Sequence, residues 1–327
     1  MEKLRVGVIG VGIMGVNHVR NYADEPGRFE LAGVYDSDKS RAEVVAGQFH
    51  TKAFGSLDEL LNAVDAVSVV VPSSLHKDIG LQVAQHGVHA LIEKPLALNS
   101  ADAELLAEAF QKRDLKLQVG HIERFNSVVV ELKKIIDPNR VIYVETHRYG
   151  PFSGNGRITD ASVVEDLMIH DVDLISHIMH PLAITDLSAS GETLRSRNTD
   201  FATAMMKFGS RAHAVVSVSR VSQNKERTIT VHTEDSCINA DLLLKTLTVT
   251  KNTDATVDGS NNSTYRQDGV VQRIFVPIQE PLRQELLAFY EVVMNGAECP
   301  VSGEVGTEAV RLCESVVERI RSKKLAV

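Results

Sequence analysis

Buried-strand patterns and helical patterns alternate along the first third of the chain. Short apolar runs rich in β-branched residues are typical of parallel strands that are covered on both faces. Five such runs are the predicted strands of this part: 4–9, 29–36, 66–71, 90–92 and 115–119. The predicted helices between them are 16–23, 40–49, one starting at the N-cap Ser56, 76–86 and one starting at 100. This alternation predicts an α/β fold with a doubly wound parallel sheet, whose ligand lies off the carboxyl ends of the strands.

The remainder of the chain shows several strand patterns in succession without helices between them. The predicted strands are 141–148, 202–208, 212–220, 227–233, 245–250 and 270–276. Polar and apolar residues alternate in 227–233, as expected for a sheet with one solvated face. This succession predicts an α+β domain with a large, mainly antiparallel open sheet. The polar stretch 252–269 reads as a loop, and helices are predicted at 128–136, 281–295 and 304–323.

The change in pattern after His121 predicts two domains, 1–121 and 122–327, with C-terminal helices that can pack back on the first domain. A chain of 327 residues can form two hydrophobic cores. The net charge of −8 argues against a nucleic-acid or anionic-membrane partner. No apolar run approaches the ~20 residues that span a bilayer. The first strand starts almost at once, which leaves no room for a signal peptide, and the three cysteines read as free thiols, so we expect a cytoplasmic protein.

A glycine motif, Gly10-x-Gly12-x-x-Gly15, separates the first predicted strand from the first predicted helix. A strand, then G-x-G-x-x-G, then a helix is the context of a dinucleotide-binding turn. Gly10 permits the tight turn, Gly12 lets the backbone approach a pyrophosphate, and Gly15 permits close packing of helix and strand. The intervening Ile13 and Met14 lie at the helix start, where free N–H groups and the positive dipole end favour phosphate.

Asp36 ends the second predicted strand, about twenty residues beyond the glycines, where an acid can accept hydrogen bonds from ribose hydroxyls. A helix N-cap or a turn residue is the alternative reading of Asp36. A carboxylate there repels a 2′-phosphate, which favours NAD over NADP. Lys39 and Arg41 follow closely and can be offered to a phosphate, so NADP stays possible.

Two further strand exits carry polar residues on the same edge of the predicted sheet. Pro72-Ser73 ends one strand, and His76 opens the helix after it. The next exit is Glu93-Lys94-Pro95, where a proline can hold the chain rigid and give Lys94 a defined direction toward the ligand edge. From the residues alone, a solvated surface charge is the alternative reading of Lys94.

Together, Gly10-x-Gly12-x-x-Gly15, Asp36, Pro72-Ser73-x-x-His76 and Glu93-Lys94-Pro95 resemble the Gfo/Idh/MocA family of oxidoreductases, over essentially the whole chain. The resemblance implies an N-terminal Rossmann domain and an NAD(P)-dependent oxidoreductase of sugars or cyclitols. It places the lysine matching Lys94 in the active site, near the nicotinamide and the reacting hydroxyl. The cofactor contacts expected on this basis are Gly10, Gly12, Ile13, Met14, Gly15, Asp36, Pro72, Ser73, His76, Glu93 and Lys94.

The most informative helical pattern in the second half covers 162–177. At about 100° per residue, Asp166, His170, Asp173 and His177 fall on one stripe. The alternatives are a solvated face and a metal site, but no further ligand is clustered in sequence, so no metal is predicted. Asp166-Leu167-Met168-Ile169-His170 matches the family's Asp-x-x-x-His element, and the resemblance implies that His170 is the catalytic base.

The implied chemistry is oxidation of a secondary alcohol by hydride transfer to nicotinamide. An imidazole titrates near neutrality, so His170 can accept the hydroxyl proton. Lys94 then hydrogen-bonds the same oxygen, and Asp166 orients the substrate or tunes the other two groups. The roles of His170 and Lys94 can be exchanged without conflict with the sequence.

Within the family, the stretches around 120–126 and 148–173 look like a subgroup that oxidises the 3-hydroxyl of UDP-N-acetylglucosamine to a ketone. A nucleotide diphosphate calls for cations, and Arg124, Arg148 and Arg157 are the candidates, beside Asn126, Asp166 and His170 as substrate contacts. Each arginine can equally be a surface residue or lie at a sheet edge.

Two other functions stay open from the sequence. One is a dehydrogenase of a free sugar or inositol. The other is a non-catalytic NAD(P)-binding sensor or partner protein, against which the joint presence of Lys94, Asp166 and His170 argues. The alternation of the second sheet and the resemblance together lead us to expect face-to-face packing of subunits in a homodimer or homotetramer.

Overall fold

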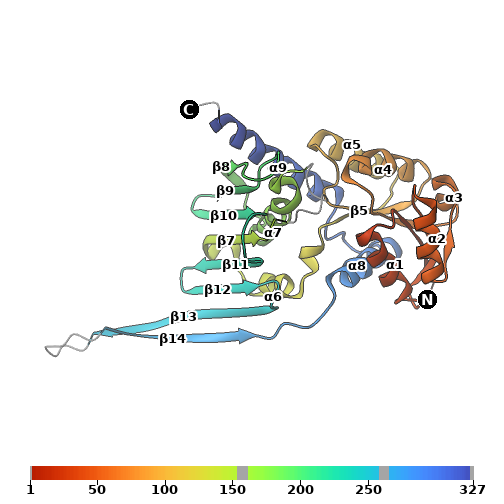
Figure 1. Cartoon of the computed structure of the whole chain (residues 1–327). Coiled ribbons are helices and arrows are strands. Elements are labelled where there is room, and N and C mark those ends of the chain that lie inside the picture. The colour runs from red at the N-terminus through yellow and green to blue at the C-terminus, as the bar shows by residue number, and fades with distance from the viewer. Residues whose placement is uncertain (1, 153–160, 258–264, 325–327) are drawn as a thin grey trace. The chain divides into compact units, whose positions relative to one another are not determined.

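The computed structural model describes residues 2–152, 161–257 and 265–324 (Figure 1). The chain divides into two compact units. Unit 1 consists of Met1–Phe125 and Glu280–Glu314, and unit 2 consists of Asn126–Gln279 and Ser315–Val327. The first division of the chain thus follows Phe125, four residues after the boundary expected from the sequence pattern.

Unit 1 is built on a six-stranded sheet in the order β3-β2-β1-β4-β5-β6, and all of its described pairs are parallel. The strands are β1 (Leu4–Ile9), β2 (Phe29–Tyr35), β3 (Lys52–Ala53), β4 (Ala66–Val69), β5 (His89–Glu93) and β6 (Leu117–Gly120). The predicted doubly wound parallel sheet is confirmed. The sequence pattern missed β3, because two residues are too short to show a period.

The helices between these strands are α1 (Ile13–Ala23), α2 (Lys39–Gln48), α3 (Leu57–Leu61), α4 (His76–Gln85) and α5 (Ser100–Gln111). The starts of α2, α3 and α5 are fixed by side-chain caps, which satisfy N–H groups that the first turn leaves unpaired. Ser56 accepts the N–H of Glu59 at the start of α3, as its sequence predicts, and Asn99 accepts that of Asp102 at the start of α5. Short 3₁₀ turns cover Ser73–Leu75 and Ile122–Phe125.

Helix α8 (Pro281–Asn295) completes the core of unit 1 from far along the chain. Leu286 and Phe289 are buried in the same cluster as the strand and helix residues of the first domain. Phe29 at the start of β2 packs its ring edge to face between Tyr22 and Tyr290, with centroid distances of 4.8 and 5.5 Å. Helix α9 (Gly303–Lys324) follows, and the division into units falls within it.

Unit 2 contains an eight-stranded sheet in the order β14-β13-β12-β11-β7-β10-β9-β8. Its strands are β7 (Val141–Tyr149), β8 (Ile184–Glu192), β9 (Phe201–Phe208), β10 (Ala212–Ser219), β11 (Glu226–Thr233), β12 (Ser236–Asp241), β13 (Thr246–Val257) and β14 (Tyr265–Ile274). The described pairs are antiparallel except β10 with β7, which is parallel. This confirms the expected mainly antiparallel open sheet.

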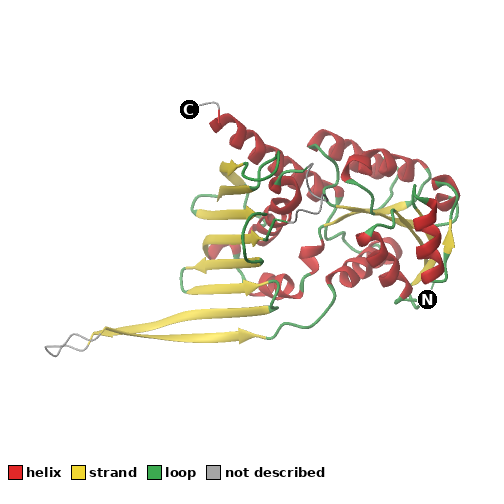
Figure 2. Cartoon of the chain, viewed as in Figure 1, coloured by secondary structure: helices red, strands yellow, loops and turns green. Residues whose placement is uncertain are grey.

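Helices α6 (Ser127–Ile135) and α7 (Ile169–Met179) lie along one face of this sheet (Figure 2). Residues of β7 alternate accordingly, with Val144, Thr146 and Arg148 buried and Tyr143, Glu145 and His147 partly exposed. Among the described residues, no helix covers the opposite face (Figure 2). No helix in the described ranges is long and apolar enough to cross a membrane.

Two sequence expectations for the second sheet are corrected. The pattern missed β8 and β12, and it assigned 252–269 to a loop, whereas β13 runs to Val257 and β14 starts at Tyr265. These polar ends pair with each other as an antiparallel ribbon, which needs no apolar face to form its backbone hydrogen bonds. Residues 258–264 of the expected loop lie outside the described residues.

The helix expected over 162–177 is also irregular at its start. Val164–Met168 forms a π-helical turn, in which the N–H of Ile169 bonds the carbonyl of Val164, five residues earlier. The regular helix α7 begins only at Ile169. A π turn is a rare local widening that is often found at functional sites. The predicted stripe, which assumed a uniform 100° rotation, therefore does not hold across this turn.

Candidate active site

The turn between β1 and α1 requires glycine at two places. Gly10 has φ +87°, and a Cβ on it would lie 2.4 Å from the carbonyl oxygen of Val70. A Cβ on Gly15 would lie 1.9 Å from the carbonyl oxygen of Gly10. Side chains at these positions would push α1 away from the sheet. The tight strand-to-helix turn expected of the glycine motif is therefore present.

Gly12 serves a different purpose from its two neighbours in the motif. It is the N-cap residue of α1, no side chain caps the helix there, and a Cβ on it would meet nothing within 4 Å. The helix start is thus bordered by open space, which suits an anionic ligand at free N–H groups. Ile13 is 65% exposed beside it, and Met14 packs against the core of unit 1. These residues fit the pyrophosphate of a dinucleotide.

Asp36 follows β2 directly and is 7% exposed. One carboxylate oxygen accepts the N–H of Val11 at 2.8 Å, and the other accepts the N–H of Asp38 at 2.9 Å. The Nη1 of Arg41 lies 3.6 Å from this carboxylate. Asp36 therefore ties the glycine turn to the end of β2, a contact that the sequence did not reveal. Asp38, not Asp36, is the N-cap of α2. A carboxylate offers about four acceptor sites, so acceptor capacity remains for ribose hydroxyls.

His76 is 1% exposed, at the start of α4. Its Nδ1 lies 2.7 Å from the carbonyl oxygen of Pro95 and its Nε2 lies 3.0 Å from that of Val71. Burial lowers the pKa of His76, so the neutral ring donates its one N–H within this pair of carbonyls. The side chain thus lies under the loop of Pro72 and Ser73 and under the Lys94–Pro95 segment. The two loops are expected to hold the cofactor, and His76 contacts both of them on the side that faces the protein interior.

The Glu93-Lys94-Pro95 segment leaves β5 with its side chains half-buried. One oxygen of Glu93 accepts the N–H of Lys94 at 3.2 Å, and the other lies 3.2 Å from the Nε2 of His18 on α1. Burial opposes ionisation of Glu93, but the hydrogen bond from His18 and the nearby charges outweigh it and lower the pKa of the carboxyl. An ionised carboxylate therefore lies next to Lys94.

Asp166 lies within the π turn and His170 in the first turn of α7, and both are half-buried. Asp173, which the sequence placed on the same stripe, is 2% exposed and belongs to the buried side of α7. The alternative of a fully solvated face is therefore wrong for this helix. His177 is half-buried in the last turn of α7.

A buried ion pair attaches α7 to the sheet. The Nε and Nη2 of Arg148 on β7 donate to the two carboxylate oxygens of Asp171 at 2.7 and 3.1 Å. The two side chains are 3% and 2% exposed. A fork-to-carboxylate pair of this kind fixes orientation as well as distance. The sequence suggested Arg148 as a diphosphate contact. In the structure its guanidinium pairs with Asp171, the residue next to His170.

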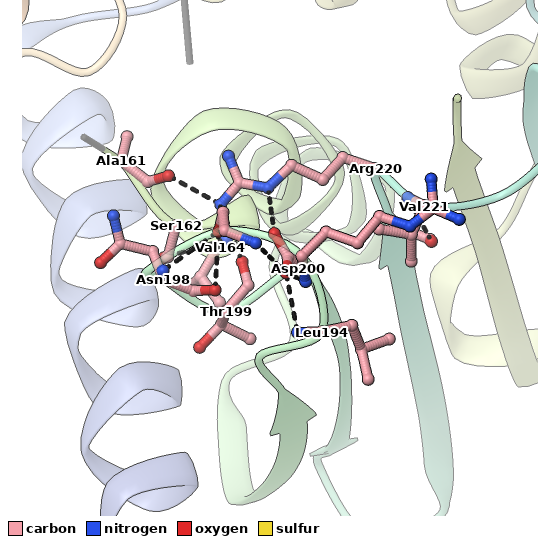
Figure 3. Close-up of polar contacts among 12 residues, drawn as sticks. Ala161, Ser162, Val164, Leu194, Asn198, Thr199, Asp200, Arg220 and Val221 are labelled. Atoms are coloured by element: carbon pink, nitrogen blue, oxygen red, sulfur yellow. Dashed lines mark hydrogen bonds and ion pairs between the residues drawn. The ribbon is translucent and has the colours of Figure 1, made fainter. Parts of the chain in front are cut away.

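A second buried arginine holds the chain just before the π turn (Figure 3). The Nε of Arg220 donates to Asp200 at 2.9 Å, and its Nη2 donates to the carbonyl oxygens of Ala161 and Thr199 at 2.9 and 3.0 Å. Asp200 also accepts the N–H groups of Leu194, Arg195 and Ser196. Burial alone would raise the pKa of Asp200, but these hydrogen bonds lower it well below the usual range.

The remaining predicted substrate contacts have the following places. Asn126 is buried, caps α6 by accepting the N–H of Val128, and accepts a hydrogen bond from Lys245. Arg124 is half-buried, and its Nη1 donates to the carbonyl oxygen of Pro300 at 3.1 Å. Arg157 lies outside the described residues. Within the described part of the chain, no group of three or more histidine, cysteine or acidic residues is placed to bind a metal ion.

Sequence reasoning missed several residues that shape these loops and helices. His18, Asp171, Asp200 and Arg220 were not singled out, although each is buried and charged or titratable. The one available signal was position: His18 follows the glycine motif within α1, and Asp171 follows His170. Their partners lie 20 or more residues away, so no local pattern identifies the pairs.

Comparisons with known proteins also identify an NAD-binding domain followed by a second domain. A family model described as "Oxidoreductase family, NAD-binding Rossmann fold" matches residues 4–121, and the Gfo/Idh/MocA C-terminal domain matches residues 136–239. The chain is 36% identical over 259 residues to UDP-N-acetylglucosamine 3-dehydrogenase of Acidithiobacillus ferrooxidans, covering 79% of this chain and 80% of that protein.

It is also 28% identical over 235 residues to scyllo-inositol 2-dehydrogenase (NAD(+)) of Bacillus subtilis, covering 68% of each chain. A solved structure of the Acidithiobacillus ferrooxidans enzyme superposes with a TM-score of 0.88 and 30% identity, covering 98% of this chain and 99% of the other. The matched domains and these relatives show that the chain belongs to the Gfo/Idh/MocA family and is an NAD(P)-dependent oxidoreductase acting on CH–OH groups.

Proposed function

We propose that this protein oxidises the 3-hydroxyl of UDP-N-acetylglucosamine to a ketone with NAD as the hydride acceptor. The observation that carries the choice of substrate is the 36% identity to a relative of that name over most of both chains. It is supported by the close superposition of nearly the whole chain on a structure of the same name.

In this proposal, bound NAD supplies the nicotinamide ring that accepts the hydride. The open helix start at Gly12 and the Asp36 carboxylate are the described groups that would hold its pyrophosphate and ribose. His170 takes the proton of the reacting hydroxyl, and Lys94 donates a hydrogen bond to the same oxygen. Asp166 orients the substrate or His170. The exchange of roles between His170 and Lys94 remains the alternative within this mechanism.

The charge of Asp36 is expected to select NAD over NADP. Asp36→Asn keeps an oxygen that can accept the N–H of Val11 but removes the charge that repels a 2′-phosphate. Arg41, which lies beside both Asp36 and Asp38, then keeps only Asp38 as a charged partner and can also meet a phosphate. We expect the NADP to NAD ratio of kcat/KM to rise at least about tenfold, which corresponds to about 1.4 kcal/mol.

Steady-state kinetics with both cofactors measure this ratio, and Glu43→Gln serves as the control. Glu43 is an exposed acid on the same helix α2, so its loss should leave the ratio unchanged. An unchanged ratio in Asp36→Asn would show that Asp36 serves only the turn.

The nucleotide diphosphate is proposed to contact Arg124, and Arg157 keeps its place as a candidate from the sequence. We do not carry Arg148 and Asn126 forward as substrate contacts, because the first is paired with Asp171 and the second caps α6. The substrate-binding set proposed for this chain is thus smaller than the sequence suggested.

The function is tested by incubating purified protein with NAD and UDP-N-acetylglucosamine while a carbonyl reagent traps the ketone. Free N-acetylglucosamine, glucose and inositol are run in parallel, each with NAD and with NADP. Formation of reduced cofactor and a 3-keto product only with the nucleotide sugar would support the proposal. Reduction with a free sugar or polyol instead would contradict it.

A dehydrogenase of inositol or a free sugar is the second candidate. It is favoured by the similarity to scyllo-inositol 2-dehydrogenase (NAD(+)), although the identity of 28% is lower than that to the nucleotide-sugar enzyme. The same assay separates the two candidates. Tight NAD binding without any turnover would instead support a non-catalytic sensor.

We also propose self-association of the chain through the sheet face of unit 2 that no described helix covers (Figure 2). Tyr143, Tyr149 and Met205 contribute apolar surface there, beside the hydroxyl groups of Thr203 and Ser217. A partly apolar open face of this kind suits isologous packing in a homodimer or homotetramer.

A further inference from the structure

A chain of four polar side chains runs through the interior of unit 1, below the glycine turn. The hydroxyl of Tyr22 lies 2.8 Å from the Oγ of Ser68, which lies 3.0 Å from the Nδ1 of His18. The Nε2 of His18 lies 3.2 Å from the Oε1 of Glu93. The chain therefore connects helix α1, strand β4 and the end of β5, where Lys94 follows.

These groups are hidden from water. His18 and Ser68 are 0% exposed, Tyr22 is 1% exposed, and the side chain of Glu93 is 12% exposed. Buried polar groups lower the stability of a fold unless each donor meets an acceptor. The protons in this chain must consequently be arranged so that no donor faces another donor.

Donor counting fixes one point, which is that the Nε2 of His18 donates to Glu93. Glu93 is an acceptor when ionised, so the Nε2 of His18 carries a proton and donates to it. The Nδ1 of a neutral His18 then accepts from the hydroxyl of Ser68, and Ser68 in turn accepts from the hydroxyl of Tyr22. Burial raises the pKa of Tyr22 well above its usual range, which keeps that terminal hydroxyl protonated. A doubly protonated His18 would instead donate from Nδ1 to Ser68, whose oxygen can accept from His18 and from Tyr22 at once, and Nε2 would still donate to Glu93.

Glu93 uses both of its oxygens. While Oε1 accepts from His18, Oε2 accepts the main-chain N–H of Lys94 at 3.2 Å. A carboxylate bound at both oxygens cannot rotate freely. Because one oxygen is held by His18 on α1 and the other holds the main chain at Lys94, α1 fixes the direction in which the backbone leaves β5. The charged and titratable groups that face this carboxylate are His18, Lys94 and His76.

We propose that His18, through Glu93, is a positioning residue for Lys94, coupling the helix that starts at the cofactor turn to the proposed catalytic lysine. This inference rests on the proposed function in that it takes Lys94 as part of the active site. Neither His18 nor Ser68 touches the reacting atoms in this proposal.

The first arm of the test needs no substrate. NMR of the protein labelled with ¹⁵N-histidine, with His18→Gln used to assign the signal, reports the protonation of each ring nitrogen. We expect the Nε2 of His18 to carry a proton, because that nitrogen faces the Glu93 carboxylate. A neutral ring with its proton on Nδ1 would overturn the proposal whatever the activity, because Nε2 would then have no proton to donate to Glu93.

The second arm uses variants and a pH profile. His18→Leu keeps bulk but removes the donor, which is one of the causes of the lowered pKa of Glu93. The carboxylate then protonates at a higher pH, so we expect the acid limb of the kcat profile to move up by about one pH unit and kcat at pH 7 to fall about tenfold. His18→Gln restores an amide donor toward Glu93 and should recover most of the loss.

His86→Leu is the matched control, because His86 caps the far end of α4 and contacts the exposed Asp58 instead. It should leave the profile and the dissociation constant of NAD unchanged. An unmoved acid limb and unchanged kcat in His18→Leu would overturn the proposal. If the wild-type protein turns over no sugar, the proposed function fails. The NMR arm alone then tests whether His18 donates a hydrogen bond to Glu93.

Discussion

His170→Ala is expected to abolish turnover while the protein still binds NAD. A positioned general base contributes about 10²–10⁴-fold to a proton transfer, so kcat should fall by at least about two orders of magnitude. His170 belongs to unit 2, whereas the glycine turn and Asp36 belong to unit 1 with its own core, so the dissociation constant of NAD should not change. Stopped-time assays of product and fluorescence titration of the cofactor measure the two quantities.

The control for this variant is His180→Ala. His180 follows α7 directly, is exposed, and uses its main-chain N–H in the helix end, which alanine preserves. Its activity should equal that of the wild type. Full activity in His170→Ala would remove His170 from the mechanism and move the role of base to Lys94.

Asp171→Ala is expected to produce the largest loss of stability. The substitution leaves the guanidinium of Arg148 buried without the carboxylate that accepts two of its hydrogen bonds. Breaking a buried pair on one side destabilises a protein by about 3–5 kcal/mol. Urea unfolding monitored by a probe in unit 2 should show this decrease in the free energy of unfolding.

Asp235→Ala provides the comparison, because Asp235 pairs with Arg140 and both side chains are about half exposed. Exposed pairs contribute little, so its unfolding midpoint should not change measurably. A midpoint for Asp171→Ala equal to that of the wild type would mean that water replaces the lost carboxylate and that the pair does not anchor α7.

Most of the fold was predictable because periodicity is a local property. A β-branched apolar run such as Ala66–Val69 has few alternatives to a buried strand, and Ser56 marks the start of α3 by a hydrogen bond within four residues. The ribbon formed by the ends of β13 and β14 was not predictable in the same way. Its polar residues hold together by cross-strand backbone bonds, which leave no hydrophobic period in the sequence.

In the candidate site, too, the features that depend on neighbours in the sequence were predictable, and those that depend on distant partners were not. The steric need for glycine at positions 10 and 15 could be inferred from the motif, since it depends on neighbours in the chain. The pairing of Arg148 with Asp171 could not, because an arginine on a strand looks the same whether it meets a phosphate or a carboxylate from a helix. Only the packing of α7 on the sheet decides between these partners.

The π turn is a further case in which local reasoning fails. Helical periodicity assumes one rotation per residue, and the widened turn at Val164–Met168 interrupts it just before His170. The sequence of this turn contains no glycine or proline that would indicate a break in the helical rotation. The phase of the helix is consequently set by its anchors, Arg148 and Arg220, rather than by its own residues.

The contacts of His76 have a consequence for how substitutions are tolerated in the two loops above it. Its ring meets the main-chain oxygens of Val71 and Pro95, not their side chains. Every amino acid carries such an oxygen, so position 71 can vary without losing the contact, whereas position 76 cannot. A saturation scan should therefore find position 76 intolerant of any residue but histidine, beside a tolerant position 71.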